Sequence, residues 1–472
     1  QVGMRIHFTG IAGAGMSATA LMMRDAGHEV SGSDAEAFPP VSTYLETLGI
    51  PFFRTFDAAH LGDDVELVVV GGSARLNGDD NPEYAEAMRR GLRITGFPQL
   101  IAEQTAGRAC TLVAGSFGKS TCTALIAHIL RQAGRDPGYM IGAIPAGGAA
   151  TGAWGSGEMI LEGDEYVVSQ ADRRSKFLLY APAHLLVTSL VHDHLNVFPS
   201  FADYEAPFRA LLRSTPAGGT VLLRNSPPLR AIAAAFAGTP VWYDDQPCDG
   251  WYSEDVVFGE TSRFTLVAPD SHDGGGRRIR LETGLLGAHN IENLVGVAAF
   301  LLERRLVTEI ELRDGIASFQ GIRRRLDRLT TASRVPLIEG FGSSWEKARS
   351  AIDAVRLHFP ERRLAVVFEP HTFSWRNREG LAWYDTVFAG VDRVVVVPPP
   401  VTGAGSHDQL SHAEILDRIV AAGVAAVGAT TPHEVETLLT GLAGDEVVLL
   451  LSSGPLLGLP ASLPPLFEAL YG

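Results

Sequence analysis

Residues 111–121 read Thr-Leu-Val-Ala-Gly-Ser-Phe-Gly-Lys-Ser-Thr, and this stretch decides the fold of the middle of the chain. The apolar run 111–114 predicts a short buried strand, and residues 120–133 predict a helix that Gly134 ends. Glycines between a strand and a helix let backbone N–H groups turn toward an anion, and the helix N-terminus adds partial positive charge. The sequence therefore predicts a phosphate-binding loop (P-loop) at residues 115–121.

The side chains of this loop suit a nucleoside triphosphate. Lys119 can reach the β- and γ-phosphates, and the Ser120 hydroxyl can ligate Mg²⁺. Lysine is scarce: the chain has 39 Lys and Arg residues, of which only Lys119, Lys176 and Lys347 are lysine. The loop is shorter than the GxxxxGK[ST] form, so a glycine turn with an incidental lysine stays open as the alternative.

A second glycine turn occupies residues 10–15, with the sequence Gly-Ile-Ala-Gly-Ala-Gly, between the strand-like residues 6–8 and a helix predicted over residues 16–26. Asp34 follows Gly15 by 19 residues, where a dinucleotide fold places an acidic residue near a ribose hydroxyl. Because the spacing is GxxGxG rather than GxGxxG, the pattern favours a nucleotide diphosphate over NAD. The alternatives are a tight turn without a ligand and a nicotinamide dehydrogenase, which leaves the P-loop unexplained.

Polar clusters follow two further predicted strands. Glu162 stands in Glu-Gly-Asp-Glu after residues 159–161, and His194 ends His-Asp-His after residues 185–187. Ligands bind at the carboxyl ends of strands in open α/β sheets, so a carboxylate of the first cluster and an imidazole of the second, beside the Ser120 hydroxyl, predict a site for a divalent ion. The alternative is a pair of solvated loops. A helix is predicted over residues 291–304, and Asn290 and Asn293 lie near its start. Either Asn290 caps this helix, or the two amides recognise a base. The arginines at 323–325 form either a solvent-exposed charged segment or a phosphate clamp.

The whole chain predicts an α/β protein of three domains. Residues 1–104 predict a Rossmann-like domain, residues 105–328 a P-loop ATPase-like domain with an antiparallel subsheet in residues 250–287, and residues 329–472 a second Rossmann-like domain. The net charge of −15 argues against nucleic-acid or anionic-membrane binding, and there is no apolar stretch long enough to span a membrane. Three cysteines without CxxC spacing and no signal peptide predict a cytoplasmic protein, monomeric or homodimeric.

In this order, the motifs resemble the Mur ligase family over essentially the whole chain. They are HFTGIAGAGMSATA at residues 7–20, HEVSGSD at 28–34, EGDEY at 162–166, RRSKF at 173–177, GAHNIEN at 287–293 and FQGIRRRLD at 319–327. The resemblance is strongest to two branches, the recycling branch of murein peptide ligases and the alanine-adding branch. It implies an ATP- and Mg²⁺-dependent amide ligase that joins the carboxylate of UDP-N-acetylmuramate to an amino acid or peptide amine in peptidoglycan synthesis or recycling.

The resemblance also implies roles for individual residues. The UDP pyrophosphate would lie against Gly10, Gly13 and Gly15, with Ser33 and Asp34 near the uridine. The residues implied at ATP are Gly115, Gly118, Lys119, Ser120 and Thr121 for the phosphates, Asn290 and Asn293 for the adenine, and Arg325 at the domain hinge. Glu162 and His194 match metal ligands, and the amine site would include Ser343, Trp345, His371 and Arg376.

Several positions depart from the family pattern. The family loop reads GTHGKT, but Ser116 and Phe117 replace its threonine and histidine, and Val167 and Val191 stand where acidic residues are usual. The third-domain motif DDFAHHPT becomes EGFGSSWE at residues 339–346, and no lysine between 176 and 347 is available for carbamylation. Two alternatives therefore remain: a paralogue that joins a different acid and amine, for instance in secondary metabolism, and a non-catalytic nucleotide-binding homologue.

Overall fold

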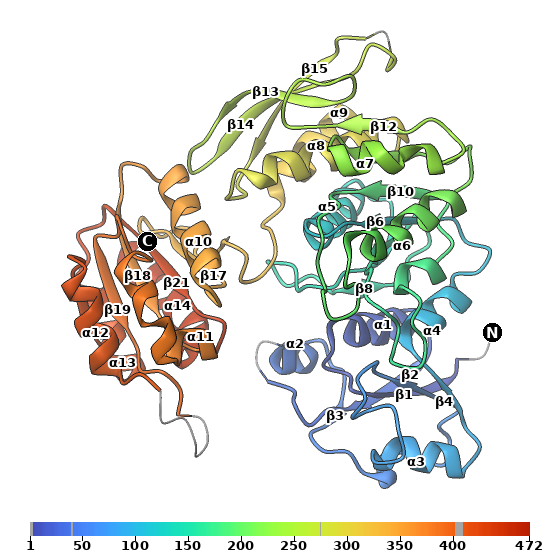
Figure 1. The fold of residues 1–472 in the computed structure, drawn as a ribbon, viewed down its shortest axis with the longest axis horizontal. Coiled ribbons are helices and arrows are strands. Elements are labelled where there is room, and N and C mark those ends of the chain that lie inside the picture. Colours follow the sequence, from blue (N-terminus) through green and yellow to red (C-terminus); the bar gives the residue numbers. More distant parts are fainter. Residues whose placement is uncertain (1–2, 39–40, 274, 402–408) are drawn as a thin grey trace. The chain divides into compact units, whose positions relative to one another are not determined.

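A computed structural model describes residues 3–38, 41–273, 275–401 and 409–472, and it shows an α/β protein with four sheets among these residues (Figure 1). The predicted fold class is confirmed. Each of the three large sheets is built mainly from parallel strands, and helices connect successive strands along the chain.

The N-terminal sheet is entirely parallel, with strand order β3-β2-β1-β4-β5. Strand β1 lies in the middle, so the glycine turn that follows it lies where the strand order reverses. The strands are β1 (Arg5–Thr9), β2 (Glu29–Ser33), β3 (Phe52–Phe53), β4 (Leu67–Val70) and β5 (Arg93–Thr95). The helices are α1 (Ala14–Asp25), α2 (Val41–Thr47), η1 (Ala58–His60), α3 (Pro82–Arg89) and α4 (Phe97–Gln104).

The central sheet has the order β12-β11-β10-β6-β9-β7-β8, and only the edge strand β8 runs antiparallel. Its strands are β6 (Cys110–Ala114), β7 (Gly138–Met140), β8 (Gly152–Ala153), β9 (Met159–Gly163), β10 (His184–Val187), β11 (Val221–Arg224) and β12 (Val241–Tyr243). Its helices are α5 (Lys119–Gln132), η2 (Lys176–Leu179), α6 (Phe201–Ser214), α7 (Pro227–Ile232), η3 (Ala233–Ala235), α8 (His289–Glu303) and α9 (Glu309–Ser318). Because β6 lies between β9 and β10, the P-loop and both predicted polar clusters emerge from three adjacent strands.

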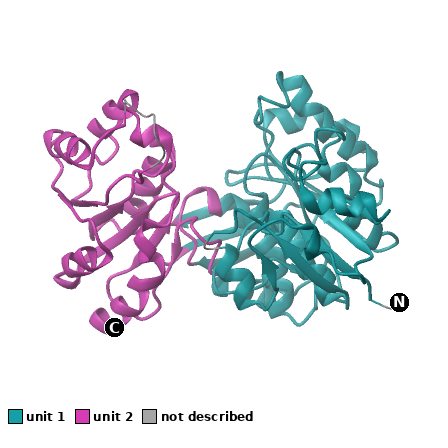
Figure 2. Ribbon diagram, turned by 90° about the horizontal axis from the view of Figure 1, so that it is seen from below, with its two compact units in different colours: residues 1–256, 263–283, 291–319 teal, residues 257–262, 284–290, 320–472 magenta. Residues whose placement is uncertain are grey.

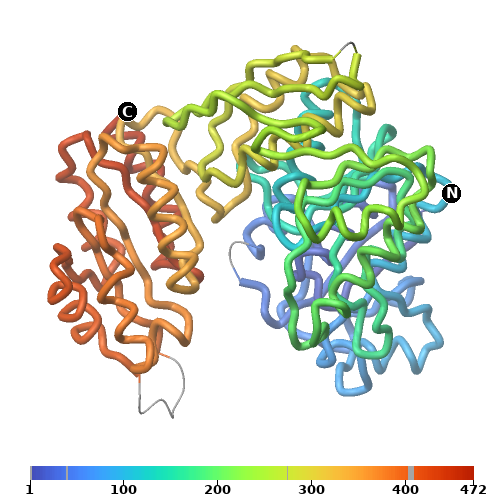
Figure 3. The backbone as a smooth tube through the Cα atoms, turned by 45° about the horizontal axis from the view of Figure 1, so that its top comes forward, coloured from blue at the N-terminus to red at the C-terminus, as the bar shows by residue number. Residues whose placement is uncertain are grey.

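A three-stranded sheet of β13 (Tyr252–Val257), β14 (Ser262–Val267) and β15 (Arg278–Thr283) follows, and Figure 3 shows its strands side by side. Each strand pairs with its neighbour in the sequence, and four residues join β13 to β14. A connection that short closes only an antiparallel pair, which agrees with the predicted hairpins.

The C-terminal sheet has the order β16-β17-β21-β18-β19-β20, with β16 as its antiparallel edge. Buried clusters lie on both of its faces, as expected for a parallel sheet covered by helices. The strands are β16 (Asp327–Arg328), β17 (Leu337–Gly340), β18 (Arg363–Phe368), β19 (Arg393–Val396), β20 (Ala426–Gly428) and β21 (Glu446–Leu451). The helices are α10 (Trp345–His358), α11 (Phe373–Arg376), η4 (Arg378–Asp385), α12 (His412–Ala421), α13 (Pro432–Thr440), η5 (Leu456–Gly458) and α14 (Leu459–Tyr471).

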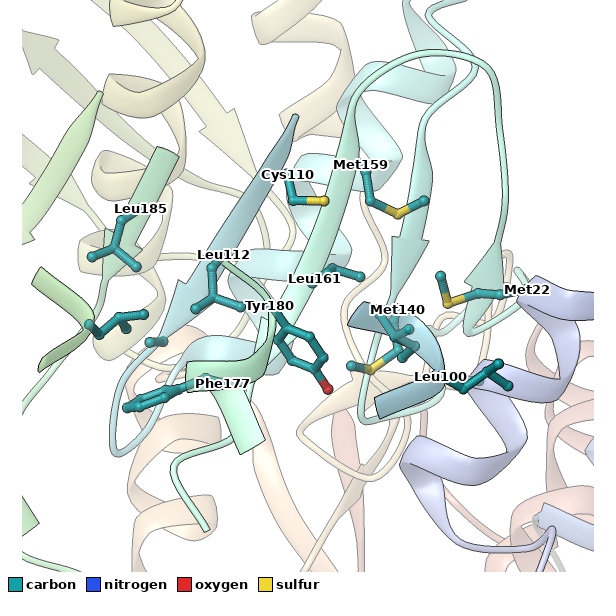
Figure 4. Packing of buried hydrophobic residues seen from close by; sticks show 14 of the residues in the cluster. Met22, Leu100, Cys110, Leu112, Met140, Met159, Leu161, Phe177, Tyr180 and Leu185 are labelled. Carbon is teal, nitrogen blue, oxygen red and sulfur yellow. The ribbon is translucent and has the colours of Figure 1, made fainter. Parts of the chain in front are cut away.

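The chain folds into two compact units, coloured separately in Figure 2. Unit 1 comprises residues 1–256, 263–283 and 291–319, and unit 2 comprises residues 257–262, 284–290 and 320–472. The N-terminal and central sheets share unit 1 because one apolar cluster joins them: Met22 of α1 lies with Met140 and Met159 of the central sheet (Figure 4). The domain boundaries at residues 104 and 328 stay predictions. Within the described residues, every helix is too short or too polar to cross a bilayer.

Candidate active site

The predicted P-loop lies between β6 and α5, and its two flanking glycines are required by its geometry. Gly115 and Gly118 have φ values of +148° and +86°, which side-chain-bearing residues rarely adopt. A Cβ atom at Gly115 would lie 2.0 Å from the Thr188 hydroxyl oxygen, and one at Gly118 would lie 2.7 Å from Asn293 Oδ1. Thr188, just after β10, and Asn293 of α8 therefore pack so closely against the loop that a side chain at either position would be strained.

The side chains of Lys119 and Ser120 both turn toward carboxylates at the end of β9. Lys119 Nζ donates to Glu165 Oε2 at 3.0 Å and to the Gly115 carbonyl at 3.1 Å. The Ser120 hydroxyl donates to Glu162 Oε1 at 2.6 Å, and the other Glu162 oxygen accepts the Gly142 N–H. The structure thus brings together Ser120 and Glu162, two of the three predicted metal ligands.

Glu165 is a hub that the sequence analysis did not select. Its side chain is fully buried, and its Oε1 atom accepts the Tyr204 hydroxyl at 3.0 Å and lies 3.3 Å from His194 Nε2. The signal was present, because Glu165 stands in the same acidic cluster as Glu162. Sequence spacing alone does not tell which of the two carboxylates reaches Lys119.

One group of side chains within the described residues has the geometry to hold a metal ion: ligand atoms of Glu165, Asp193 and His194 lie within 4.8 Å of one another. His194 has a φ of +54°, a conformation that non-glycine residues adopt mainly under constraint from their surroundings. His192 instead bonds the Phe198 carbonyl at 2.7 Å. Carboxylate and hydroxyl oxygens with one imidazole fit Mg²⁺ or Mn²⁺. Glu162 and His194 thus belong to two separate contact groups, Ser120–Glu162 and Glu165–Asp193–His194.

The asparagines of the predicted adenine site differ in placement. Asn293 lies against the start of α5, since its Oδ1 is 3.6 Å from Cys122 Sγ as well as close to Gly118. Helix α8 begins at His289, so Asn290 lies inside the first turn and is not its N-cap, which removes one of the two alternatives for this residue. The Asn290 amide donates to the Leu286 carbonyl at 2.9 Å. Arg325 is exposed and lies near His289; desolvation by neighbouring groups, followed by the positive charge of Arg325, lowers the pKa of His289.

The N-terminal glycine loop has a different construction. Gly10 has a φ of +90°, and a Cβ atom at Gly15 would lie 2.3 Å from the Phe97 ring, whereas Gly13 has ordinary space around it. Asp34 is buried and its carboxylate accepts the Ala12 N–H at 3.0 Å. The buried Asp34 carboxylate therefore fixes the shape of the loop through this hydrogen bond.

Beneath this loop lies a buried hydrogen-bond network centred on Glu83. Its carboxylate bonds His7 Nε2 at 2.8 Å, His60 Nδ1 at 2.9 Å and the Thr9 hydroxyl at 2.8 Å, and the fully buried Ser33 hydroxyl bonds both imidazoles. Burial alone would raise the pKa of Glu83, but the bonds from His7 and His60 lower it to about 2. Ser33 thus belongs to the interior of the domain.

A cavity of about 450 Å³ opens at the carboxyl ends of β4 and β5 within unit 1. Its lining includes Gly72, Asn77, Tyr84 and Phe97 from the N-terminal sheet and its helices, and Val168 and Ser169 from the segment that follows Glu165. A Cβ atom at Gly72 would lie 2.6 Å from the Val168 carbonyl oxygen, so the two segments touch. The volume and location are typical of a small-molecule site in an α/β protein.

The residues of the predicted amine site lie in unit 2 at the carboxyl end of its sheet. The Ser343 carbonyl oxygen accepts a hydrogen bond from the Thr372 hydroxyl at 2.8 Å, and His371 Nδ1 lies 3.3 Å from the Ser453 hydroxyl. The loops after β17, β18 and β21 therefore meet here. Trp345 is the first residue of α10 and donates its indole N–H to Thr386 at 3.0 Å. Arg376 ends α11 and is half-buried.

Comparison with known proteins decides the family. The model of the Mur ligase family, catalytic domain, matches residues 5–108, and that of the Mur ligase middle domain matches residues 113–301. A UDP-N-acetylmuramate–L-alanine ligase from Roseiflexus sp. (strain RS-1) is 32% identical over 94% of this chain and 97% of its own length. The enzyme of that name from Kineococcus radiotolerans is 33% identical over 93% of each chain. The chain belongs to the Mur ligase family.

Solved Mur ligases share the fold along the full chain. The UDP-N-acetylmuramate-alanine ligase of Thermotoga maritima superimposes with a TM-score of 0.78 at 22% identity over 99% of each chain. The murein peptide ligase of Psychrobacter arcticus 273-4 gives a TM-score of 0.63 at 24% identity, again over 99% of each chain. These similarities confirm the predicted fold and, with the sequence relatives, the predicted family and its enzyme class, an ATP-dependent acid–amino-acid ligase.

This Mur ligase exposes apolar side chains at two of its sequence departures. Phe117 in the P-loop is 56% exposed, and Val191 after β10 is 53% exposed. Both backbones are nevertheless tied to the loop: Phe117 N–H donates to the Ser189 hydroxyl at 2.9 Å, and Val191 N–H donates to the Ser116 hydroxyl at 2.8 Å. The departures therefore change the surface of the site and leave the loop conformation anchored.

Proposed function

We propose that this chain ligates the carboxylate of UDP-N-acetylmuramate to an amine through an acyl phosphate, at the expense of ATP and in the cytoplasm, during peptidoglycan synthesis or recycling. The observation that carries the proposal is the arrangement at the P-loop, where Lys119 and Ser120 face two buried carboxylates at the end of β9. The names of the relatives support UDP-N-acetylmuramate as the acid substrate, and the amine in those names is L-alanine.

The reaction needs positioning and charge neutralisation more than covalent chemistry. The substrate carboxylate attacks the γ-phosphorus of ATP, giving an acyl phosphate and ADP; the amine nitrogen then attacks the acyl carbon, and phosphate leaves. The loop N–H groups and Lys119 would hold the phosphates, so Lys119 must exchange Glu165 for phosphate oxygens when ATP binds. Bound Mg²⁺ neutralises phosphate charge, and Ser120, Glu162, Glu165 and His194 are the residues that would hold it.

The acid substrate is supported by two features of unit 1. The loop at residues 10–15 offers backbone N–H groups to a diphosphate and is kept in shape by Asp34. The cavity at the ends of β4 and β5 leads toward the segment that carries Glu165, since Val168 and Ser169 line it. We infer that a sugar linked to a diphosphate at the N-terminal loop extends toward the segment that carries Glu165.

The amine is where a second candidate function enters. Ser343 and Ser344 cannot carry positive charge or take up a proton near pH 7, as imidazoles can, and Trp345 adds an apolar surface at the start of α10. These residues favour a smaller or more apolar amine than the peptide used by the recycling branch, and hence a paralogue with its own acid and amine pair. A non-catalytic homologue is disfavoured by Lys119 and Ser120 in place.

The test is release of ADP and phosphate by the full chain with UDP-N-acetylmuramate and a panel of amines: L-alanine, glycine, L-serine, L-valine and the tripeptide L-alanyl-γ-D-glutamyl-meso-diaminopimelate. We expect turnover with a small amine and little with the tripeptide. A kcat/KM for the tripeptide of about 10⁴ M⁻¹s⁻¹ or more would show that the altered motif is tolerated. Lys119→Ala is the background control, and calorimetry with NAD tests the dehydrogenase alternative.

A further inference from the structure

The hydroxyl of Tyr204 occupies a position between the P-loop and the carboxylate that faces Lys119. Tyr204 lies in the first turn of α6, whose start is fixed by a capping box between Ser200 and Asp203. Its side chain is fully buried, although the sequence gives no reason to place it in the site. None of the roles assigned above uses it.

A chain of three hydrogen bonds runs through this hydroxyl. Val191 N–H donates to Ser116 Oγ at 2.8 Å, Ser116 Oγ lies 2.7 Å from the Tyr204 oxygen, and the Tyr204 hydroxyl donates to Glu165 Oε1 at 3.0 Å. A carboxylate only accepts, so the tyrosine proton points to Glu165 and the serine donates to the tyrosine. Burial, followed by the charge of Glu165, raises the pKa of Tyr204 above its usual value, so the phenol stays protonated.

The two oxygens of Glu165 therefore have different partners. Oε2 receives Lys119 at 3.0 Å, while Oε1 receives Tyr204 and lies 3.3 Å from His194. We propose that Tyr204 is a positioning residue, whose hydroxyl fixes the rotation of the Glu165 carboxylate so that one oxygen serves the P-loop lysine and the other the metal group with Asp193 and His194. This inference rests on the proposed function for its catalytic consequence, but its metal-binding consequence does not.

The competing explanation is that Tyr204 only packs. Its ring contacts Phe198 and Phe208 with centroids 5.4 Å away, and His192 at 5.8 Å, so the ring belongs to the core of unit 1. Tyr204→Phe separates the two explanations, because it keeps the ring and removes only the donor to Glu165. The buried carboxylate then loses a hydrogen bond of the charge-assisted kind, whose removal typically changes an equilibrium by tenfold or more.

A matched control is Tyr243→Phe. Tyr243 is also a fully buried tyrosine of unit 1, and among the described residues its hydroxyl has no hydrogen-bond partner. The first measurement is Mn²⁺ binding to the full chain without nucleotide, by calorimetry, with Mn²⁺ as the probe for Mg²⁺. We expect Tyr204→Phe to weaken binding about tenfold, Tyr243→Phe to leave it unchanged, and both variants to keep the wild-type melting temperature within a few degrees.

The second measurement is a double-mutant cycle with Glu165→Gln. Tyr204→Phe should lower kcat about tenfold with little change in KM for ATP, and it should add nothing in the Glu165→Gln background. Wild-type Mn²⁺ affinity in Tyr204→Phe, an equal loss in both backgrounds, or no Mn²⁺ binding by the wild-type chain at millimolar concentration would each overturn the proposal. If no amine supports turnover, the proposed function fails while the Mn²⁺ arm still decides the role of Tyr204.

Discussion

The two glycine loops of unit 1 follow the same plan and differ in what stands behind them. Each follows a central parallel strand and leads into a helix, α1 in one case and α5 in the other. Behind the P-loop stand Lys119 and two buried carboxylates at the strand ends, whereas behind the N-terminal loop stands Asp34, bonded to the Ala12 N–H. The P-loop has its own cation, Lys119, and the N-terminal loop has only backbone donors.

Under the proposed function, the two loops treat their polyphosphates differently. A lysine that can leave Glu165 for a phosphate oxygen stabilises charge that develops during a reaction. Backbone N–H groups held by a buried aspartate offer fixed donors, which suit a diphosphate that is bound and left intact. Under the proposed function, the P-loop carries the chemistry and the N-terminal loop anchors the UDP diphosphate.

The largest effect is expected from Lys119→Ala. Alanine leaves the γ-phosphate without its cation, so ATP turnover should fall on the order of 10²-fold or more. Binding of UDP-N-acetylmuramate, measured by calorimetry, should stay within twofold because the N-terminal loop is untouched. Normal turnover by a folded Lys119→Ala protein would contradict the assignment of the P-loop.

The next effect concerns the buried network under the N-terminal loop. The folded-state pKa of Glu83 is about 2, below the ordinary 4.5, so its stabilisation is present above pH 4.5 and is lost as the pH falls through 2. Glu83→Gln should lower the free energy of unfolding at pH 7 by about 3 kcal/mol. It should also make the free energy of unfolding fall less steeply as the pH is lowered toward 2, the acid limb of its pH dependence. Urea unfolding from pH 7 to pH 2 measures both. Glu86→Gln on the same helix is the control, and an acid limb of equal steepness in Glu83→Gln would refute the network.

A smaller effect is expected from Asp34→Ala, which should change the affinity for the ligand of the N-terminal loop but not for that of the P-loop. Asp34→Ala frees the Ala12 N–H and loosens the loop, so affinity for UDP-N-acetylmuramate should fall about tenfold. ATP binding in the same protein should not change. Equal losses for both ligands would show that Asp34 supports unit 1 as a whole instead of the N-terminal loop.

The smallest effects come from a pair of glycine substitutions. Gly118→Ala puts a side chain at φ +86° against Asn293, which should cost about 1–2 kcal/mol of stability. Gly13→Ala meets nothing closer than 3.5 Å and should melt like the wild type. If the diphosphate lies against Gly13, the alanine variant still loses affinity for the UDP-sugar while keeping its stability, and unchanged affinity would move the diphosphate elsewhere on the loop.

Local patterns predicted most of the fold because strand, turn and helix signals agree over short stretches. The P-loop is the clearest case, since residues 110–132 contain its strand, its glycines and its helix. The start of α8 is a weaker case: Asn290 is an N-cap candidate in the sequence, but α8 begins at His289 and the Asn290 side chain bonds the Leu286 carbonyl from inside the first turn. A polar residue near a helix start satisfies either geometry, and only the tertiary path of the chain selects one.

The parts of the site that escaped prediction depend on contacts between distant segments. Glu165 and Tyr204 are 39 residues apart, and their contact requires α6 to pack against the end of β9. Asp34 near the uridine stays a prediction, and the bond of its carboxylate to the Ala12 N–H, 22 residues earlier, is a contact that the sequence did not indicate. In both cases the sequence shows the residue itself. Its partner depends on the order of strands in a sheet, and the spacing of apolar residues along the chain does not predict that order.

Because lysine is scarce, chemical labelling of lysine side chains can report on the P-loop. Lys119 and Lys176 both bond carboxylates of one short segment, Glu165 and Asp164, and their side chains are only 18% and 17% exposed, while Lys347 is exposed in unit 2. An amine-acylating reagent therefore has three side chains to label, and peptide mass spectrometry separates them. Loss of label at Lys119 alone, as ATP is titrated in, reports occupancy of the P-loop in the unmodified sequence, with Lys347 as the internal standard.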